Sequence, residues 1–241
     1  AEHELEKRYF YLIDDIKVME ELAGLLNKRR AEDGSLDFDL PEPEIIIDIE
    51  ARVEDIARAE RNIAHRIIEE FMLAANRAVA EEFSKKGLPF LYRVHGFPDA
   101  ENVQSFKEFA AAYGLHLLKP SKGPKAFQNL LKEAGGRPEE KLINHVLLRS
   151  MKQAVYSETN TGHFGLGFED YTHFTSPIRR YPDLVVHRLL KTHIHGRYPK
   201  KDRDAVKESL HAVAAHASAR ERKAMEAERE VVDLKRAQFM K

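Results

Sequence analysis

The 241-residue chain contains no cysteine and no tryptophan. Without cysteine it can form neither a disulfide nor a thiolate metal site, and a reducing cytoplasm is its simplest compartment. The chain also lacks an apolar run of membrane-spanning length, and its N-terminus is too charged for a signal peptide. We therefore expect a cytoplasmic protein with no membrane partner.

The composition that is present suits a folded domain. Hydrophobic residues make up 43% of the chain, and the length allows one large domain or two small ones. The net charge of −1 hides an asymmetry, because residues 176–241 hold 16 Lys and Arg against 9 Asp and Glu. A basic C-terminal third suits a polyanionic partner, although a solvated helix surface has the same composition.

Hydrophobic spacing predicts a helix-rich α+β fold. Apolar residues at helical intervals indicate a helix from about Tyr9 to Arg29. The β-branched run Ile45–Ile49 predicts a strand, with Val53–Ile56 as its hairpin partner, and Asn62 is expected to cap a helix that reaches Phe83. The remaining prediction is a strand within 90–97, three short helices between 99 and 151, an extended segment over 154–175 and a long helix over 202–241.

The stretch Gly162–Leu190 is the most informative part of the chain. Its glycines permit close backbone approach, and its aromatic residues can stack or form hydrogen bonds. Ser176-Pro177 is typical of an N-cap and a first helical residue, which places Arg179 and Arg180 in the first turn. Alternatively, Pro182 begins the helix and residues 177–181 form a preceding turn. Backbone N–H groups and guanidinium groups at one point favour a phosphate ligand, whereas the structural alternative is a salt bridge at a helix start.

Several motifs carry a family resemblance that extends over the chain from Tyr9 onward. They are "GSLDFDLPE", "NIAHRIIEEFMLAANRAVAEEF", "LYRVHGFPD", "HFGLGFEDYTHFTSPIRRYPDLVVHRLL" and "SARERKAMEAEREVVDLKRAQFM", in this order. Together they resemble the ribonuclease II/ribonuclease R (RNB domain) family of 3′–5′ exoribonucleases, and ribonuclease R in particular. The resemblance implies processive hydrolysis of single-stranded RNA to nucleoside 5′-monophosphates with Mg²⁺, for which two-metal chemistry is suited.

The aspartate loop that holds the metal ions in this family is not found in the sequence. Asp14-Asp15 is an early aspartate pair, but it lies in a helical pattern, and we interpret it as a solvated face. We therefore expect the C-terminal half of an RNB catalytic domain, with a partial β-sheet packed by helices. On this expectation residues 1–241 lack the metal-binding half, the cold-shock-like domains and the S1 domain, and the Mg²⁺ ligands lie outside the chain.

The resemblance assigns two catalytic residues. Arg179 matches an arginine that contacts the scissile or adjacent phosphate and supports the transition state. Glu228, in "EAERE", matches a glutamate near the active site, although its spacing alone would indicate a surface charge pair.

The remaining matches concern RNA contacts. Glu69 matches a glutamate that recognises ribose, and Asn76 lies seven residues later on the same helical face. Phe38 matches an aromatic that stacks on the terminal base, while a core phenylalanine is the alternative. Further RNA-channel candidates are Tyr156, His163, Ser176 and Arg180.

Other chemistry is less well supported. A zinc site would need three or four converging ligands, and the histidine-rich stretch around His193 and His195 is more typical of a helix surface. We predict no metal site in the chain. The leading hypothesis is a piece of an exoribonuclease that is inactive alone, with single-stranded RNA as ligand. The missing N-terminal half or a second copy is expected to cover strand edges and apolar surface. The alternative is a non-catalytic RNA-binding or scaffold protein derived from an RNB domain.

Overall fold

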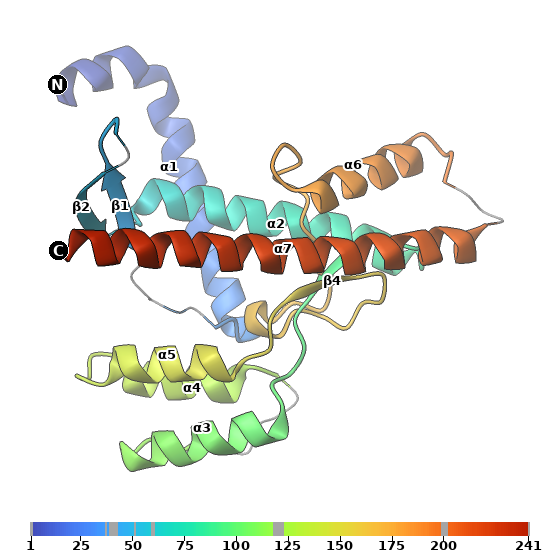
Figure 1. The fold of residues 1–241 in the computed structure, drawn as a ribbon. Coiled ribbons are helices and arrows are strands. Elements are labelled where there is room, and N and C mark those ends of the chain that lie inside the picture. Colours follow the sequence, from blue (N-terminus) through green and yellow to red (C-terminus); the bar gives the residue numbers. More distant parts are fainter. Residues whose placement is uncertain are drawn as a thin grey trace.

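Two hydrophobic cores organise the chain, and one extended segment runs between them. The computed structural model describes residues 2–36, 38, 43–50, 52–58, 61–117, 123–198 and 202–240. In chain order the elements are α1 (Glu2–Asp33), β1 (Pro43–Ile47), β2 (Val53–Arg58), α2 (Ile63–Lys85), β3 (Tyr92–Val94), α3 (Ala100–Ala112), α4 (Lys125–Ala134), α5 (Glu140–Ser150), β4 (Val155–Ser157), the 3₁₀ turn η1 (Phe164–Leu166), α6 (Tyr181–Ile194) and α7 (Arg203–Phe239). The prediction of a helix-rich α+β fold is confirmed (Figure 1).

The first core joins α2, β3, β4, α6 and α7. Fully buried aromatic side chains lie at its centre, with Phe83 stacked on Phe90 at a ring-centroid distance of 4.1 Å. Val186 of α6 and Leu210 of α7 close it from the other side. Figure 1 shows how α7 runs across this part of the molecule as one long helix. The core therefore fixes α6 and α7 relative to the antiparallel pair of β3 and β4.

The second core lies among α3, α4 and α5, which form a separate group in Figure 1. Phe106, Phe127 and Leu147 are fully buried there. Phe164 of η1 also belongs to this core, whereas Phe174 packs against the first one. Residues 164–174 thus connect the two cores.

Most predicted elements are confirmed. The hairpin of β1 and β2 pairs antiparallel with a register shift between Ile46 and Ile47. Asn62 caps α2 as expected, because its side chain accepts a hydrogen bond from the His65 backbone N–H while the His65 ring accepts from the Asn62 N–H. The first strand ends at Ile47, earlier than predicted, since the Asp48 side chain accepts backbone hydrogen bonds and forms a turn.

The start of α6 corrects one prediction. Ser176 is not its N-cap, and Arg179 and Arg180 do not lie in its first turn. The helix begins at Tyr181 with Pro182 in the first turn, and residues 177–179 form a preceding turn, as in the alternative interpretation. The physical reason is that the Asp183 carboxylate accepts the Ser176 backbone N–H, which folds the chain back before the helix starts.

Large apolar side chains are exposed at several places among the described residues. Along α1 these include Phe10, Tyr11 and Leu25, which are 71%, 63% and 59% exposed. Asp14 and Asp15 are exposed on the same helix, as predicted. Among the described residues β1 and β2 pair only with each other, whereas the second edge of β3 forms hydrogen bonds with the segment 162–171. No described helix is both long and apolar enough to cross a membrane.

Candidate functional site

The segment from Gly162 to Thr175 is anchored along β3 by its backbone. Arg93 donates its N–H to the Tyr171 carbonyl at 2.9 Å, and Phe164 donates to the His95 carbonyl at 2.8 Å. Gly162 and Gly167 adopt positive φ angles of 77° and 67°. At Gly167 a Cβ atom would lie 3.1 Å from the Asp33 carbonyl oxygen, and the positive φ would add strain, so glycine favours this close approach to the end of α1.

Asn76 holds the second half of this segment in place. It is 2% exposed on α2, and its amide donates to the Tyr171 hydroxyl at 3.1 Å while its carbonyl accepts from the Phe174 N–H at 2.9 Å. Sequence comparison suggested an RNA contact for this side chain. In the structure both ends of the amide bind the protein itself, so Asn76 supports the segment that leads to the arginines.

The residues Ser176–Arg180 form what we call the arginine turn. Asp183, which is completely buried, accepts hydrogen bonds from Arg180 Nε at 2.9 Å and Nη2 at 2.7 Å. Its Oδ1 also accepts the Ser176 N–H at 2.8 Å. Such a bidentate pair fixes the plane of the guanidinium group. Asp183 and Arg180 therefore pin both ends of the turn.

Arg179 projects from the middle of the arginine turn. Its side chain is exposed and makes no hydrogen bond or ion pair with any other residue in the described ranges. It lines a cavity of about 850 Å³ between the arginine turn and α7. The other lining residues are Tyr156, Arg180, Tyr181, Pro182, Ala212, Val213, His216, Ala217, Arg220, Glu221 and Ala224. This groove joins an apolar floor to cationic groups.

A hydrogen-bonded network forms the back of the groove. Arg93 donates to Glu221 of α7 at 2.6 Å and lies over the Tyr156 ring at 4.7 Å from its centroid. The Tyr156 hydroxyl contacts His173 Nδ1 at 2.9 Å. Through these contacts β3, β4 and α7 hold one wall of the groove in a fixed arrangement.

The imidazole and phenol groups near this wall are uncharged near neutral pH. Burial lowers the pKa of His173 to about 2, and the nearby Arg180 and Arg93 lower it further. Burial likewise lowers the pKa of His163 to about 3, with His95 and Arg93 as additional causes. Burial raises the pKa of Tyr156 to about 12. Positive charge at the groove therefore comes from arginine and not from these imidazoles.

The structure brings three of the predicted site residues, Arg179, Arg180 and Tyr156, to this groove. Ser176 lies behind it through its bond to Asp183. His163 accepts a hydrogen bond from the Leu166 N–H at its Nδ1, within the anchored segment. These placements leave the RNA contacts of Ser176 and His163 as predictions.

Three further predicted residues, besides Asn76, Ser176 and His163, also lie outside the lining of the groove. Glu228 is exposed on α7 and lies four residues after Ala224, so it continues the same helix face one turn further on. Glu69 forms an ion pair with Arg61 at 2.6 Å on the exposed side of α2. Phe38 is partly buried against the second core, a position that agrees with the alternative of a core residue.

Sequence reasoning missed Asp183, Arg93 and the buried Glu70. Asp183 stands three residues after Arg180 in "RRYPDL", a spacing at which opposite charges meet on a helix, and this signal could have found it. Arg93 lies between the buried Tyr92 and Val94, where a charge needs a partner. Glu70 could not be told from Glu69 by residue type.

A metal centre cannot be built from the described residues. No three His, Asp or Glu side chains among them lie close enough to share an ion. Histidines in and near this stretch are engaged separately: His187 contacts the Phe174 carbonyl, His193 contacts Glu82, and His211 contacts Glu158. The described residues therefore do not fit a magnesium or zinc site.

The chain also matches known proteins. Residues 1–196 match the family model described as the RNB domain. Ribonuclease R 1 of Lactococcus lactis is 45% identical over 236 residues, which cover 97% of this chain and 29% of that protein. Ribonuclease R of Aquifex aeolicus is also 45% identical, over 98% of this chain and 34% of its own length. The chain thus spans about a third of the length of these curated relatives.

Solved structures show the same fold. The structure of Mycoplasma genitalium RNase R in complex with ribose methylated single-stranded RNA superposes with a TM-score of 0.89 at 29% identity, covering 95% of this chain and 36% of the other. The structure of yeast Ssd1, described as a pseudonuclease, superposes with a TM-score of 0.57 at 27% identity, and the match covers 66% of this chain and 20% of the Ssd1 chain. On the extent of the family match and of these similarities, the chain belongs to the RNB domain family.

Proposed function

We propose that this chain supplies the phosphate-binding side of a 3′–5′ exoribonuclease that acts on single-stranded RNA. The observation that carries the proposal is the exposed Arg179, held at the edge of an 850 Å³ groove by a turn that Asp183 fixes. A guanidinium group offers two parallel donors to the non-bridging oxygens of a phosphodiester.

Each part of the groove has a role in this proposal. Arg179 binds the phosphate and stabilises the negative charge that grows in the transition state. Tyr181, which is 54% exposed, offers an aromatic face to a base, and Arg220 adds a second cation on α7. Asp183 and Arg180 keep Arg179 in position, and Glu228 lies one helical turn beyond the groove, where it can orient the terminal nucleotide.

Magnesium belongs to the same proposal, and its ligands do not come from the described residues. When bound, the ions would supply the nucleophilic water and stabilise the leaving oxygen. We propose that carboxylates from the complementary half of an RNB domain, or from a second copy, provide the ligands. The same partner would cover the exposed apolar side chains of α1. The isolated chain is accordingly expected to bind RNA without hydrolysing it. We propose the cytoplasm as the compartment of the protein.

RNA binding can be tested with one charge at a time. We expect Arg179→Gln to weaken binding of a fluorescein-labelled single-stranded 12-mer about fivefold and to lower the salt dependence of log Kd by about 0.7, the share of one phosphate contact. Arg188→Gln is the matched control, because Arg188 is exposed on α6, lies outside the groove and loses the same charge. Equal affinities of the two variants would contradict the proposal.

Hydrolysis separates this function from its alternative. A non-catalytic RNA-binding protein is the second candidate, since the described residues form no metal cluster and the pseudonuclease Ssd1 shares the fold. The purified chain is incubated with 5′-labelled poly(A) and Mg²⁺, alone and with the complementary half of an RNB domain. Hydrolysis only in the mixture, lost with Arg179→Gln, supports the exoribonuclease. Processive shortening by the chain alone would refute the expected inactivity, and RNA binding without hydrolysis in either case would favour the alternative.

A further inference from the structure

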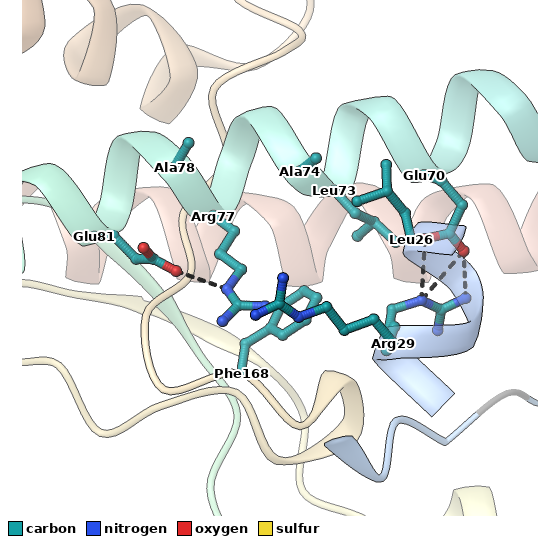
Figure 2. A pocket seen from close by; sticks show the side chains of 10 residues that line it. Leu26, Arg29, Glu70, Leu73, Ala74, Arg77, Ala78, Glu81 and Phe168 are labelled. Atoms are coloured by element: carbon teal, nitrogen blue, oxygen red, sulfur yellow. Dashed lines mark hydrogen bonds and ion pairs between the residues drawn. The ribbon is translucent and has the colours of Figure 1, made fainter. Parts of the chain in front are cut away.

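A second cavity lies on the other face of the anchored segment. It has a volume of about 280 Å³ and opens between the C-terminal half of α1, the middle of α2 and the ring of Phe168 (Figure 2). Phe168 follows Gly167, whose backbone approaches the end of α1, and the Gly165 carbonyl accepts the Leu36 N–H at 2.8 Å. These contacts build the cavity into the fold.

Four of the five charged groups that line this cavity are paired, and Arg30 and Glu70 form the more buried of the two pairs. Arg30 is 7% exposed and forms an ion pair with Glu70 at 2.7 Å, and its Nη1 also donates to the Ser35 hydroxyl at 2.6 Å. Asn27 completes this group by donating to Glu70 at 2.8 Å. This buried pair engages three of the five N–H groups of Arg30 within the protein, so we assign the ligand contacts to the other two arginines of the lining.

Arg77 is held in a fixed position. Its Nε donates to Glu81 at 2.7 Å, and its guanidinium carbon lies 5.1 Å from the centroid of the Phe168 ring. Hydrogen bonds from Lys85 and from Arg77 lower the pKa of Glu81, so this carboxylate stays charged. Arg77 Nη1 also lies 3.8 Å from Asp33 Oδ2, so an aromatic face and two carboxylates orient this cation in advance, and the longer of the two ion pairs leaves N–H groups for a ligand.

Arg29 brings an unpaired cation to the same cavity. Its side chain makes no hydrogen bond or ion pair within the part of the chain that the structure describes, although it lines the cavity together with Arg77. Figure 2 shows the side chain of Arg29 extending from α1 toward that of Arg77. Glu81 and Asp33 offset the charge of Arg77, whereas the charge of Arg29 has no such partner and favours an anionic ligand.

We propose that this cavity binds a phosphate group of a nucleotide ligand, with Arg29 and Arg77 as its clamp. The forked donors of two arginines match the oxygens of a phosphate ester. The apolar part of the lining, Leu26, Leu73 and Ala74, leaves room beside the phosphate for a sugar. The phosphate could belong to a phosphodiester of RNA or to a free mononucleotide, and both present the same oxygens to the clamp.

This second site extends the proposed function. If the bound phosphate belongs to RNA, the proposal rests on that function. Phe168 and Arg179 belong to one continuous stretch of chain, yet the two cavities share no lining residue. A strand of RNA would thus meet a phosphate contact on each side of this stretch. Binding of a free mononucleotide at the Arg29–Arg77 clamp does not depend on Arg179.

The test uses a single exposed arginine and its neighbour. Arg29→Gln removes the unpaired cation, and Lys28→Gln is the matched control, because Lys28 is exposed one residue earlier on α1, loses the same charge and does not line the cavity. The complete 241-residue chain is titrated with a labelled single-stranded 12-mer RNA by fluorescence anisotropy and with adenosine 5′-monophosphate by calorimetry. Far-UV circular dichroism verifies the fold of each variant.

We expect Arg29→Gln to weaken binding about fivefold, and to lower the salt dependence of log Kd for RNA by about 0.7, with Lys28→Gln close to the unmodified chain. A loss for RNA alone assigns the clamp to a phosphodiester, and a loss for both ligands assigns it to a terminal phosphate as well. Arg29→Gln and Lys28→Gln behaving alike with both ligands would overturn the proposal. Arg179→Gln in parallel separates the two ideas: if it weakens RNA binding while Arg29→Gln weakens the binding of neither ligand, only the clamp is wrong.

Discussion

Replacing Asp183 by asparagine tests whether the arginine turn depends on one buried carboxylate. Asp183 is 0% exposed, and the side chain of its partner Arg180 is 19% exposed. Asparagine keeps the size but removes the negative charge, which leaves Arg180 without its counter-charge in a mostly buried place. Breaking a buried pair from one side costs about 3–5 kcal/mol, and the partial exposure of Arg180 places the expected loss near the lower value, about 3 kcal/mol.

The free energy of unfolding measures this loss. Urea titrations followed by circular dichroism give the difference directly, and thermal scans should show Tm lower by about 6–12 °C, since about 1 kcal/mol corresponds to about 2–4 °C in a domain of this size. Asp233→Asn is the matched control, because Asp233 forms the same i,i+3 pair with Arg236 at an exposed position on α7. We expect that variant to lose less than about 0.5 kcal/mol.

A double-mutant cycle makes the test sharper. Combined with Arg180→Met, the Asp183→Asn change should cost less than it does alone, because the charge that it leaves unpaired is gone. In the Asp183→Asn background, Arg179→Gln should also lose most of its effect on RNA affinity, since the turn no longer positions Arg179. A loss below about 1 kcal/mol for Asp183→Asn, or strictly additive effects with Arg180→Met, would refute the reasoning.

Two further predictions concern the anchored segment. Asn76→Ala removes the hydrogen bonds to Tyr171 and Phe174 and should lower the free energy of unfolding by about 2–3 kcal/mol, whereas Asn129→Ala, on an exposed face of α4, should stay within about 0.5 kcal/mol; equal losses would contradict the role of Asn76. His163 and His173 have pKa values lowered to about 3 and about 2, while the unfolded chain protonates histidine near pH 6.5, so the unfolded state binds more protons below that pH. Stability should therefore be full above about pH 6.5 and fall by about 2 kcal/mol per histidine between pH 6.5 and 5, measured by urea titration at each pH. The slope should decrease in His173→Gln, and an unchanged slope in that variant would be evidence against a neutral buried imidazole.

Local sequence patterns predicted those elements well whose start or pairing is decided by residues close together in the chain. The Asn62 cap and the hairpin of β1 and β2 depend on neighbours in the chain, so their signals are visible in a short window. The start of α6 could not be settled in this way. The start depends on whether the Asp183 carboxylate accepts the Ser176 N–H. The sequence offers both Ser176 and Pro182 as start signals, and this contact decides between them.

The sequence predicted the residues that line the groove better than the contacts that hold them in place. Arg179 and Tyr156 were identified from motif resemblance, and they line the same groove. The wall made by Arg93 and Glu221 joins residues 128 positions apart, and no local pattern indicates that pairing. Phe38 shows the opposite case, because a stacking aromatic and a core aromatic have the same residue type and differ only in what packs against them.

The segment that joins the two cores has a consequence for fluctuations. Phe164 is embedded in one core and Phe174 packs against the other, and only ten positions separate them. Amide protons between these residues should exchange with solvent slowly, through openings that loosen at least one core, whereas those of the exposed N-terminal turns of α1 should exchange rapidly. Local opening would thus be unevenly distributed. The N-terminal turns of α1 open often, while the stretch that leads to Arg179 keeps its conformation between the two cores.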